Sequence, residues 1–92
     1  MSDNERSMAL AKRLGAKIKK GSRVAYSRAF LKSMCAEATD PAWFARGIVW
    51  SVEPFTDFTA ASVHWDGDGE GETSRLLTTN LVRVEDMQNE ER

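Results

Sequence analysis

The second half of the chain is built of short runs in which apolar and polar residues alternate, separated by residues that favour turns. The clearest runs cover residues 48–52, 61–65 and 81–84, and residues 66–71 comprise three glycines and three acidic residues. An apolar period of two, bounded by Gly and Asp, is typical of half-buried antiparallel strands. A small curled barrel buries one face of such strands and leaves little open edge. The sequence therefore predicts a mainly β fold.

Size and composition indicate one water-soluble domain. The chain has 92 residues, of which 41% are hydrophobic and 29% are charged, values that are ordinary for a globular protein. No apolar run approaches the ~20 residues that a membrane span needs, and residues 1–20 lack the features of a secretory signal. Cys35 is the only cysteine, so neither a disulfide within the chain nor a thiolate zinc site is expected. We expect a cytoplasmic protein without membrane contact.

Residues 1–20 have the pattern of a basic amphipathic helix. Ser2 and Glu5 have the spacing of a capping box, and apolar residues recur at Leu10, Leu14 and Ile18. We expect a helix over residues 4–19, weakened by about 1 kcal/mol at Gly15 relative to alanine. A flexible arm is the alternative, because terminal segments are often poorly ordered unless something holds them.

The rest of the chain divides into five expected strands and their connections. The strands are predicted over residues 23–27, 45–53, 59–65, 73–77 and 82–86. A helical turn or two over residues 29–38 interrupts the first long connection and ends before Pro41, because the residue before a proline is pushed out of the helical region. A single tight turn is expected at residues 78–80. Residues 21–86 thus form the folded body, and residues 87–92 a disordered polar tail.

This arrangement resembles the SH3-like small barrels, the group that includes Tudor and KOW modules. The residues that carry the resemblance are Gly21-Ser22-Arg23-Val24, Ala45-Arg46-Gly47-Ile48-Val49, Val63-His64-Trp65-Asp66 and Thr79-Asn80-Leu81-Val82-Arg83-Val84. The resemblance implies a five-stranded SH3-like barrel with an N-terminal helix and a helical turn in the first long loop. The ALYDY-type motif and the paired tryptophans of modules that bind proline-rich peptides are absent. In size and style the chain also resembles small proteins of bacteriophages and prophages, which implies a bacterial host cell.

Aromatic residues supply the main candidates for protein binding. Trp50 and Trp65 are in phase with Val52 and Val63, so both are predicted to lie in or near the core. Bulky apolar groups in connections are harder to explain as core and are candidates for a contact surface. The predicted protein-binding residues are Trp43, Phe44, Phe55, Phe58 and Tyr26.

Charge is divided unevenly along the chain. Residues 1–46 hold ten Lys and Arg against four Asp and Glu, a net +6, whereas residues 47–92 hold three against ten, a net −7. The basic half suggests a nucleic-acid-binding surface made of Lys17, Lys19, Lys20, Arg23 and Arg28. Two alternatives stay open: a solvated helix face, and a match with the acidic half of the same or another copy.

The sequence gives little support for catalysis or for a cofactor. His64 is the only histidine and is expected to face solvent, while Cys35 is expected to be a small buried hydrophobic residue in a helical turn. Residues 66–71 match the start of an EF-hand loop, but the required glutamate is replaced by Leu77 and the flanks read as strands. We therefore expect no metal site, no enzyme activity and a non-catalytic protein-interaction module. The alternatives are a nucleic-acid-binding barrel and a structural phage component.

Overall fold

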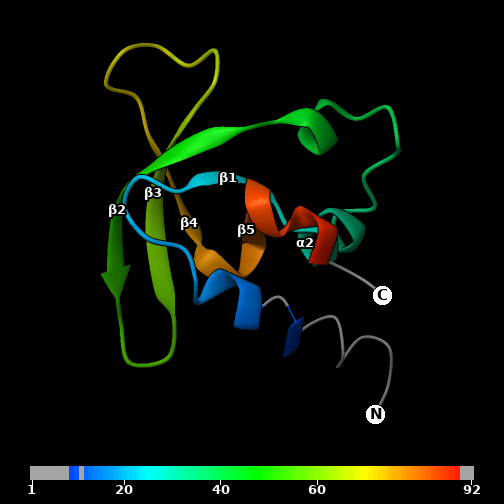
Figure 1. The fold of residues 1–92 in the computed structure, drawn as a ribbon. Coiled ribbons are helices and arrows are strands. Elements are labelled where there is room, and N and C mark those ends of the chain that lie inside the picture. The colour runs from blue at the N-terminus through cyan, green and yellow to red at the C-terminus, as the bar shows by residue number, and fades with distance from the viewer. Residues whose placement is uncertain (1–8, 11, 90–92) are drawn as a thin grey trace.

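The computed structural model describes residues 9, 10 and 12–89 (Figure 1). Its strands are β1 (Arg23–Tyr26), β2 (Gly47–Pro54), β3 (Thr59–Trp65), β4 (Ser74–Leu77) and β5 (Leu81–Arg83). Besides the helical residues 9, 10 and 12–15 near the N-terminus, the helices are the α-helix α2 (Arg28–Ser33) and the 3-10 helices η1 (Pro41–Phe44), η2 (Thr78–Asn80) and η3 (Val84–Asn89). The five strands form one antiparallel sheet in the order β4-β3-β2-β1-β5. The prediction of a mainly β domain is confirmed.

The sheet is open at β4 and β5, which are its two edges. Among the described residues no pairing joins these two strands, so the closed barrel expected from the sequence is not confirmed. β2 is the longest strand, with eight residues. It pairs with β1 only at Gly47 and Ile48 but runs beside β3 over its whole length. The sheet therefore depends on β2 to connect its β5-β1 part to its β3-β4 part.

The core lies on both sides of β1. Val24 belongs to a cluster with the inner residues of β2 and β3, whereas Ala25 packs on the opposite side with Leu14 and Val82. The members of the larger cluster are Ile18, Val24, Val49, Ala61, Val63, Trp65 and Leu81. Alternation along β1 thus places successive side chains in two separate apolar layers.

A single serine connects α2 to η2. Ser27 is the N-cap of α2, where its Oγ accepts a hydrogen bond from the Phe30 N–H at 3.2 Å and donates one to the Thr79 carbonyl oxygen at 3.3 Å. The Ser27 N–H also donates to the Asn80 carbonyl oxygen at 2.9 Å. These bonds explain why a serine is buried here, because each of its polar groups has a partner.

The prediction for the C-terminal part is wrong after Arg83. Residues 84–89 form η3 instead of the end of a strand and the start of a disordered tail. The buried carboxylate of Asp86 accepts a hydrogen bond from the Arg83 Nε at 2.7 Å, and this pair between residues three apart favours a helical turn. Residues 90–92 of the expected tail lie outside the described residues.

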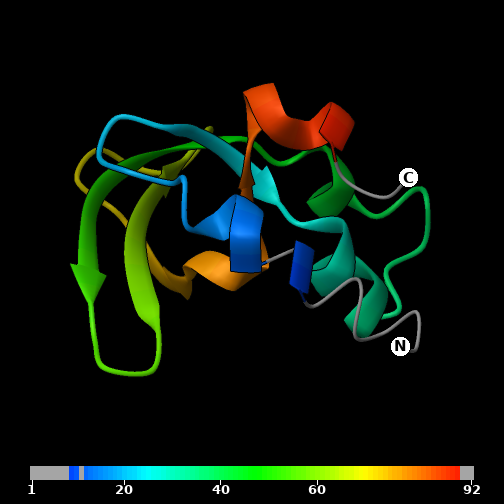
Figure 2. The ribbon, with the colours of Figure 1, turned by 60° about the horizontal axis from the view of Figure 1, so that its bottom comes forward.

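The N-terminal helix ends earlier than the sequence predicts. Residues 9, 10 and 12–15 are helical and residues 16–17 form a turn, while residues 4–8 and 11 of the expected helix lie outside the described residues. Leu14 and Ile18 consequently do not share a helix face: Leu14 packs in the smaller cluster and Ile18 in the larger one. Figure 2 shows the blue helical turn of residues 12–15 beside the orange segment of η2.

Gly15 makes this close approach possible. A Cβ atom at this position would lie 2.5 Å from the Thr78 carbonyl oxygen and 2.9 Å from its carbonyl carbon. Both atoms belong to the backbone of η2 and cannot rotate away. Glycine is therefore required here by packing, although it weakens the helix.

We predict that Gly15→Ala destabilises the protein, by about 1–3 kcal/mol, because the added methyl group overpacks the contact with η2. Helix propensity alone predicts the opposite sign, a gain of about 1 kcal/mol. Chemical denaturation of the two proteins measures the difference. Arg13→Ala, at an exposed position of the same helical turn, is the control and should change stability by less than about 0.5 kcal/mol. A stabilised Gly15→Ala variant would contradict the packing argument.

Candidate interaction surface on the outer face of the sheet

A β-bulge at Trp50 decides which side chains of β2 face outward. Val49 pairs with Val63 and Ser51 pairs with Ser62. Trp50 is therefore the extra residue of the bulge and pairs with no residue of β3. Val49 is buried, Trp50 is 46% exposed, and Val52 packs against the core again beyond the bulge. A bulge resets the alternation of a strand. The prediction that Trp50 lies in the core is therefore wrong, whereas that for Trp65, only 8% exposed, is confirmed.

Trp50 stacks on His64, which lies on the same face of the neighbouring strand. The two ring centroids are 5.4 Å apart and the ring planes are inclined by 22°. The Nδ1 atom of His64 lies 2.7 Å from the Glu72 carbonyl oxygen, so Nδ1 carries the proton and donates it to that bond. His64 is half-buried rather than fully solvent-facing, because the indole covers one side of its ring.

The other end of the same face carries a second aromatic pair. Phe55 and Phe58 lie in the connection between β2 and β3 and stack with their centroids 4.7 Å apart. The Arg75 guanidinium carbon from β4 lies 5.5 Å from the centroid of the Phe55 ring. Arg75 also forms an ion pair with Glu53. These contacts connect β4 to the β2-β3 hairpin across the surface of the sheet.

We call this surface the outer face. Its apolar side chains come from β2, β4 and the β2-β3 connection and are each between 41% and 48% exposed: Ile48, Trp50, Phe55, Phe58 and Leu77. Large exposed apolar residues that gather on one face often mark a binding site. Within the described residues nothing covers them.

The residues predicted for protein binding do not all lie together. Trp43 and Phe44 belong to η1 before β2, whereas Phe55 and Phe58 follow it, so the two pairs lie at opposite ends of the strand (Figure 1). An eight-residue strand is roughly 26 Å long. Phe44 is 69% exposed, while Trp43 is half-buried and its Nε1 donates to the Ala36 carbonyl oxygen at 3.3 Å.

Tyr26 has an interior role instead of a surface one. Its ring stacks between Trp65, at 4.6 Å, and Phe30, at 5.3 Å, and it packs against the larger core cluster. Burial raises the pKa of its phenol, with a further contribution from the charge of Asp68. Tyr26 therefore packs against the core beside residues 66–71, which we call the acidic turn.

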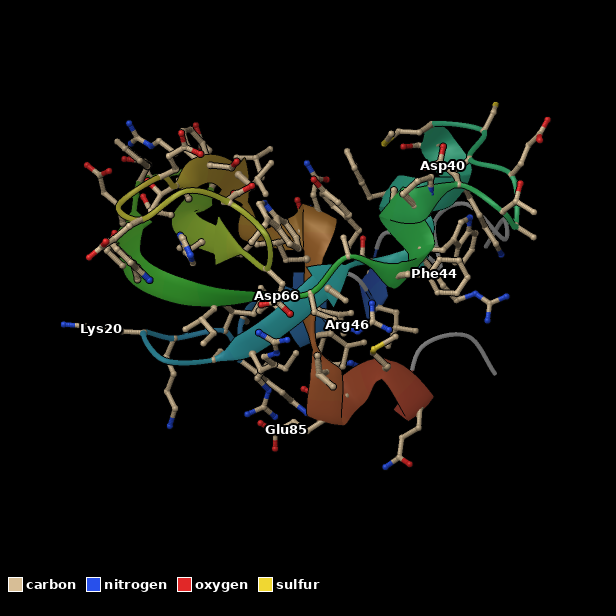
Figure 3. All side chains as sticks on the ribbon, turned by 90° about the horizontal axis from the view of Figure 1, so that it is seen from above. Lys20, Asp40, Phe44, Arg46, Asp66 and Glu85 are labelled. Carbon is tan, nitrogen blue, oxygen red and sulfur yellow. The ribbon has the colours of Figure 1, made fainter. Side chains whose placement is uncertain are left out.

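The basic residues proposed for nucleic-acid binding are not all available. The guanidinium of Arg23 donates to both carboxylate oxygens of Asp66, which ties the basic half of the chain to the acidic half. Arg28 also has an interaction partner. Lys17, Lys19 and Lys20 are exposed and form no ion pair with any described residue. In Figure 3 Lys20 projects from the end of the molecule opposite to Phe44.

The acidic turn that follows β3 is held by its own hydrogen bonds. Gly67 and Gly71 have φ angles of +91° and +82°, which side-chain-bearing residues rarely adopt. The carboxylate of Glu72 accepts a hydrogen bond from the Gly69 N–H at 3.1 Å. In the described part of the chain no group of three His, Cys, Asp or Glu side chains is placed to hold a metal ion.

Cys35 is exposed, so the prediction that it is a buried hydrophobic residue is wrong. It follows the C-cap of α2 with a φ of +55°. The Cys35 N–H donates to the Lys32 carbonyl oxygen, and the Ala36 N–H donates to the Leu31 carbonyl oxygen. This is a Schellman ending, in which the left-handed position usually holds glycine. Here Cys35 occupies that position and is exposed.

Comparison with protein-family models, with curated proteins and with solved structures finds no match for the chain. Among the residues described here, no helix combines the length and the apolar character that crossing a membrane requires.

We predict that Asp66→Asn lowers stability near neutral pH and that this difference disappears in acid. Hydrogen bonding to Arg23 lowers the pKa of the Asp66 carboxyl below its ordinary value of 3.8. The stabilisation is therefore fully present above the unfolded-state pKa and is lost as the pH falls through the lower folded-state pKa. Denaturation of both proteins across this pH range measures it. Asp57→Asn, at an exposed position of the β2-β3 connection, is the control, and a constant difference for Asp66→Asn would contradict the prediction.

Proposed function

We propose that this chain is a non-catalytic protein-interaction module that binds its partner through the outer face. The observation that carries the proposal is the gathering of Ile48, Trp50, Phe55, Phe58 and Leu77 on one side of a three-stranded section of the sheet, each more than 40% exposed. Burial of this surface by a partner would remove a large apolar area from water. Each square ångström of such area contributes roughly 25 cal/mol before the costs of association.

The aromatic pairs are suited to act as anchors. Trp50 is held against His64, and Phe55 is held between Phe58 and Arg75. Side chains that are already fixed lose little conformational freedom on binding, and tryptophan is enriched among the residues that dominate binding energy. The Glu53–Arg75 ion pair adds a polar element that a partner can use for orientation.

We further propose that the sheet curls in the manner of an SH3-like barrel. Three features support this: the strand order, the long connection with its helical turns between β1 and β2, and the single 3-10 turn η2 that separates β4 from β5. Such a fold hosts many unrelated functions, so it does not by itself favour any one partner.

Nucleic-acid binding is the second candidate function. It is favoured by the exposure of Lys17, Lys19 and Lys20, none of which is neutralised by an ion pair among the described residues. Phosphate contacts made by such lysines would give binding that weakens steeply with salt. A gel shift at low salt against single-stranded and duplex DNA and RNA tests it, and the absence of a complex at micromolar protein would remove this candidate.

Substitution on the outer face tests the main proposal. We expect Trp50→Ser with Phe58→Ser to reduce capture of the partner from a lysate of the organism that encodes the chain, by about 30-fold or more if both are dominant anchors. Quantitative mass spectrometry of the captured proteins measures this reduction. Phe44→Ser is the matched control, because Phe44 is the most exposed of these aromatic residues but lies at the other end of β2. The proposal is wrong if the double variant captures the same proteins as the unchanged chain.

A further inference from the structure

In the part of the chain that the structure describes, β4 is an edge strand with a strand partner on one side only. Its four residues pair with β3 alone, and the strand order ends there among the described residues. Edge strands present unpaired N–H and C=O groups that can accept another extended segment. The opposite edge, β5, is shorter, with three residues, and runs directly into η3.

Hydrogen bonds at the two ends of the β2-β3 ladder identify which groups of β4 are unpaired. The Asp66 N–H donates to the Arg46 carbonyl oxygen at 2.8 Å. The Phe55 N–H donates to the Phe58 carbonyl oxygen at 2.7 Å. Backbone groups of successive residues in a strand point to alternate sides. The even-numbered residues from 58 to 66 therefore bond to β2, and the odd-numbered residues of β3 bond to β4.

Pairing then assigns the two sides of β4. Ser74 and Leu76 lie opposite Val63 and Ala61, so their N–H and C=O groups bond to β3. Arg75 and Leu77 lie opposite Ser62 and Ala60, so the N–H and C=O groups of Arg75 and the N–H group of Leu77 point to the unpaired side. The C=O group of Leu77 is used by η2, because Leu77 is the N-cap of that helix. The same two residues place their side chains on the outer face, where Arg75 contacts Phe55. A strand added at this edge would extend the outer face.

The charge beside this edge is negative. β4 follows directly on the acidic turn, in which Asp68 and Glu70 are exposed and form no ion pair with any described residue. Arg75 is the only basic residue of β4 and it is already paired with Glu53. An incoming segment that carries lysine or arginine near the turn would be attracted, and one that carries acidic residues would be repelled. A second copy joined antiparallel through the same edge would place its uncharged residues 77–80 beside the turn, so it would supply no basic residue there.

We propose that β4 takes up an extended, basic segment of a partner protein as a sixth, antiparallel strand, with the basic residues of the segment beside the acidic turn. The inference rests on the proposed function and deepens it, because it names the chemistry of the partner. Backbone hydrogen bonds from Arg75 and Leu77 hold the segment, and its alternate side chains pack beside Leu77 on the outer face.

Amide hydrogen exchange measured by NMR tests the proposal. The probe is a short peptide of alternating valine and threonine that ends in two lysines, blocked at both ends. An antiparallel strand places its C-terminal lysines beside Ser74 and the turn. In the free chain we expect slow exchange at Ser74 and Leu76 and fast exchange at Arg75 and Leu77. With the peptide, exchange at Arg75 and Leu77 should slow by tenfold or more.

A control peptide and the solution mass distinguish strand addition from non-specific adsorption and from self-association. The same peptide ending in two glutamates should leave Arg75 and Leu77 unprotected, and equal protection by both peptides overturns the charge preference. No protection with the lysine peptide at millimolar concentration overturns the proposal. Slow exchange at Arg75 and Leu77 in the free chain, together with a doubled solution mass, shows instead that a second copy occupies the edge and also overturns it.

A proline substitution at the edge tests the backbone bonds directly. Leu77 has a φ of −70°, which proline adopts without strain, and its N–H points away from β3. Leu77→Pro thus removes the outward donor, whereas Leu77→Ala removes only the side chain. We expect the proline variant to bind the lysine peptide three- to tenfold more weakly than the alanine variant. Equal affinity of the two folded variants overturns the proposal.

These outcomes are separable from failure of the proposed function. If Trp50→Ser with Phe58→Ser abolishes capture of the partner while Arg75 and Leu77 stay unprotected, the outer face binds a partner without strand addition. If the edge amides become protected but the double variant captures the same proteins, strand addition stands and the apolar anchors are wrong.

Discussion

The β-bulge at Trp50 is the constraint on which the arrangement of this molecule depends. Val49 and Val52 are three positions apart, so a regular strand would direct them to opposite faces. The extra residue lets both valines pack against the same core cluster. β2 therefore presents one apolar face to the core both where it pairs with β1 and further along, where it pairs with β3 alone. The same bulge turns Trp50 outward, against His64. The exposed tryptophan is thus a direct consequence of how the long strand keeps its core continuous.

Packing on the other side of β1 completes the domain with very few residues. Ala25 and Val82 are small enough for Leu14 to approach, and the absence of a side chain at Gly15 lets the backbone of the helical turn touch η2. The chain then turns so that Ile18 reaches the opposite cluster. One short segment therefore contributes to both apolar layers, which matters in a chain of 92 residues that can bury only a limited share of its surface.

The strands and η2 can be predicted from the sequence because alternation and turn residues are local signals. The first four strands lie within two residues of their expected bounds, and Phe55 and Phe58 are recognisable as exposed because they lie between strands. Trp50 is mispredicted because the run Ile48-Val49-Trp50 is apolar throughout and is compatible with either phase. That continuous run is the available signal of a bulge. The end of the N-terminal helix depends on a tertiary contact of Gly15 with η2. The helix η3 depends on the side-chain pair of Arg83 and Asp86, and the exposure of Cys35 depends on a left-handed turn that gives no pattern.

Among the described residues, one ion pair joins the basic half of the chain to the acidic half, while those of Arg75 and Arg83 lie within the second half. Arg23 and Asp66 neutralise each other where the basic and acidic halves meet. Beyond that contact, Lys17, Lys19 and Lys20 leave a positive region and Asp68 and Glu70 a negative one. Exposed charges of this kind steer and orient a partner more than they add affinity, whereas apolar burial supplies affinity without direction. Because the negative region adjoins both the outer face and the edge of β4, the two contributions would act together on the partner that we propose for this chain.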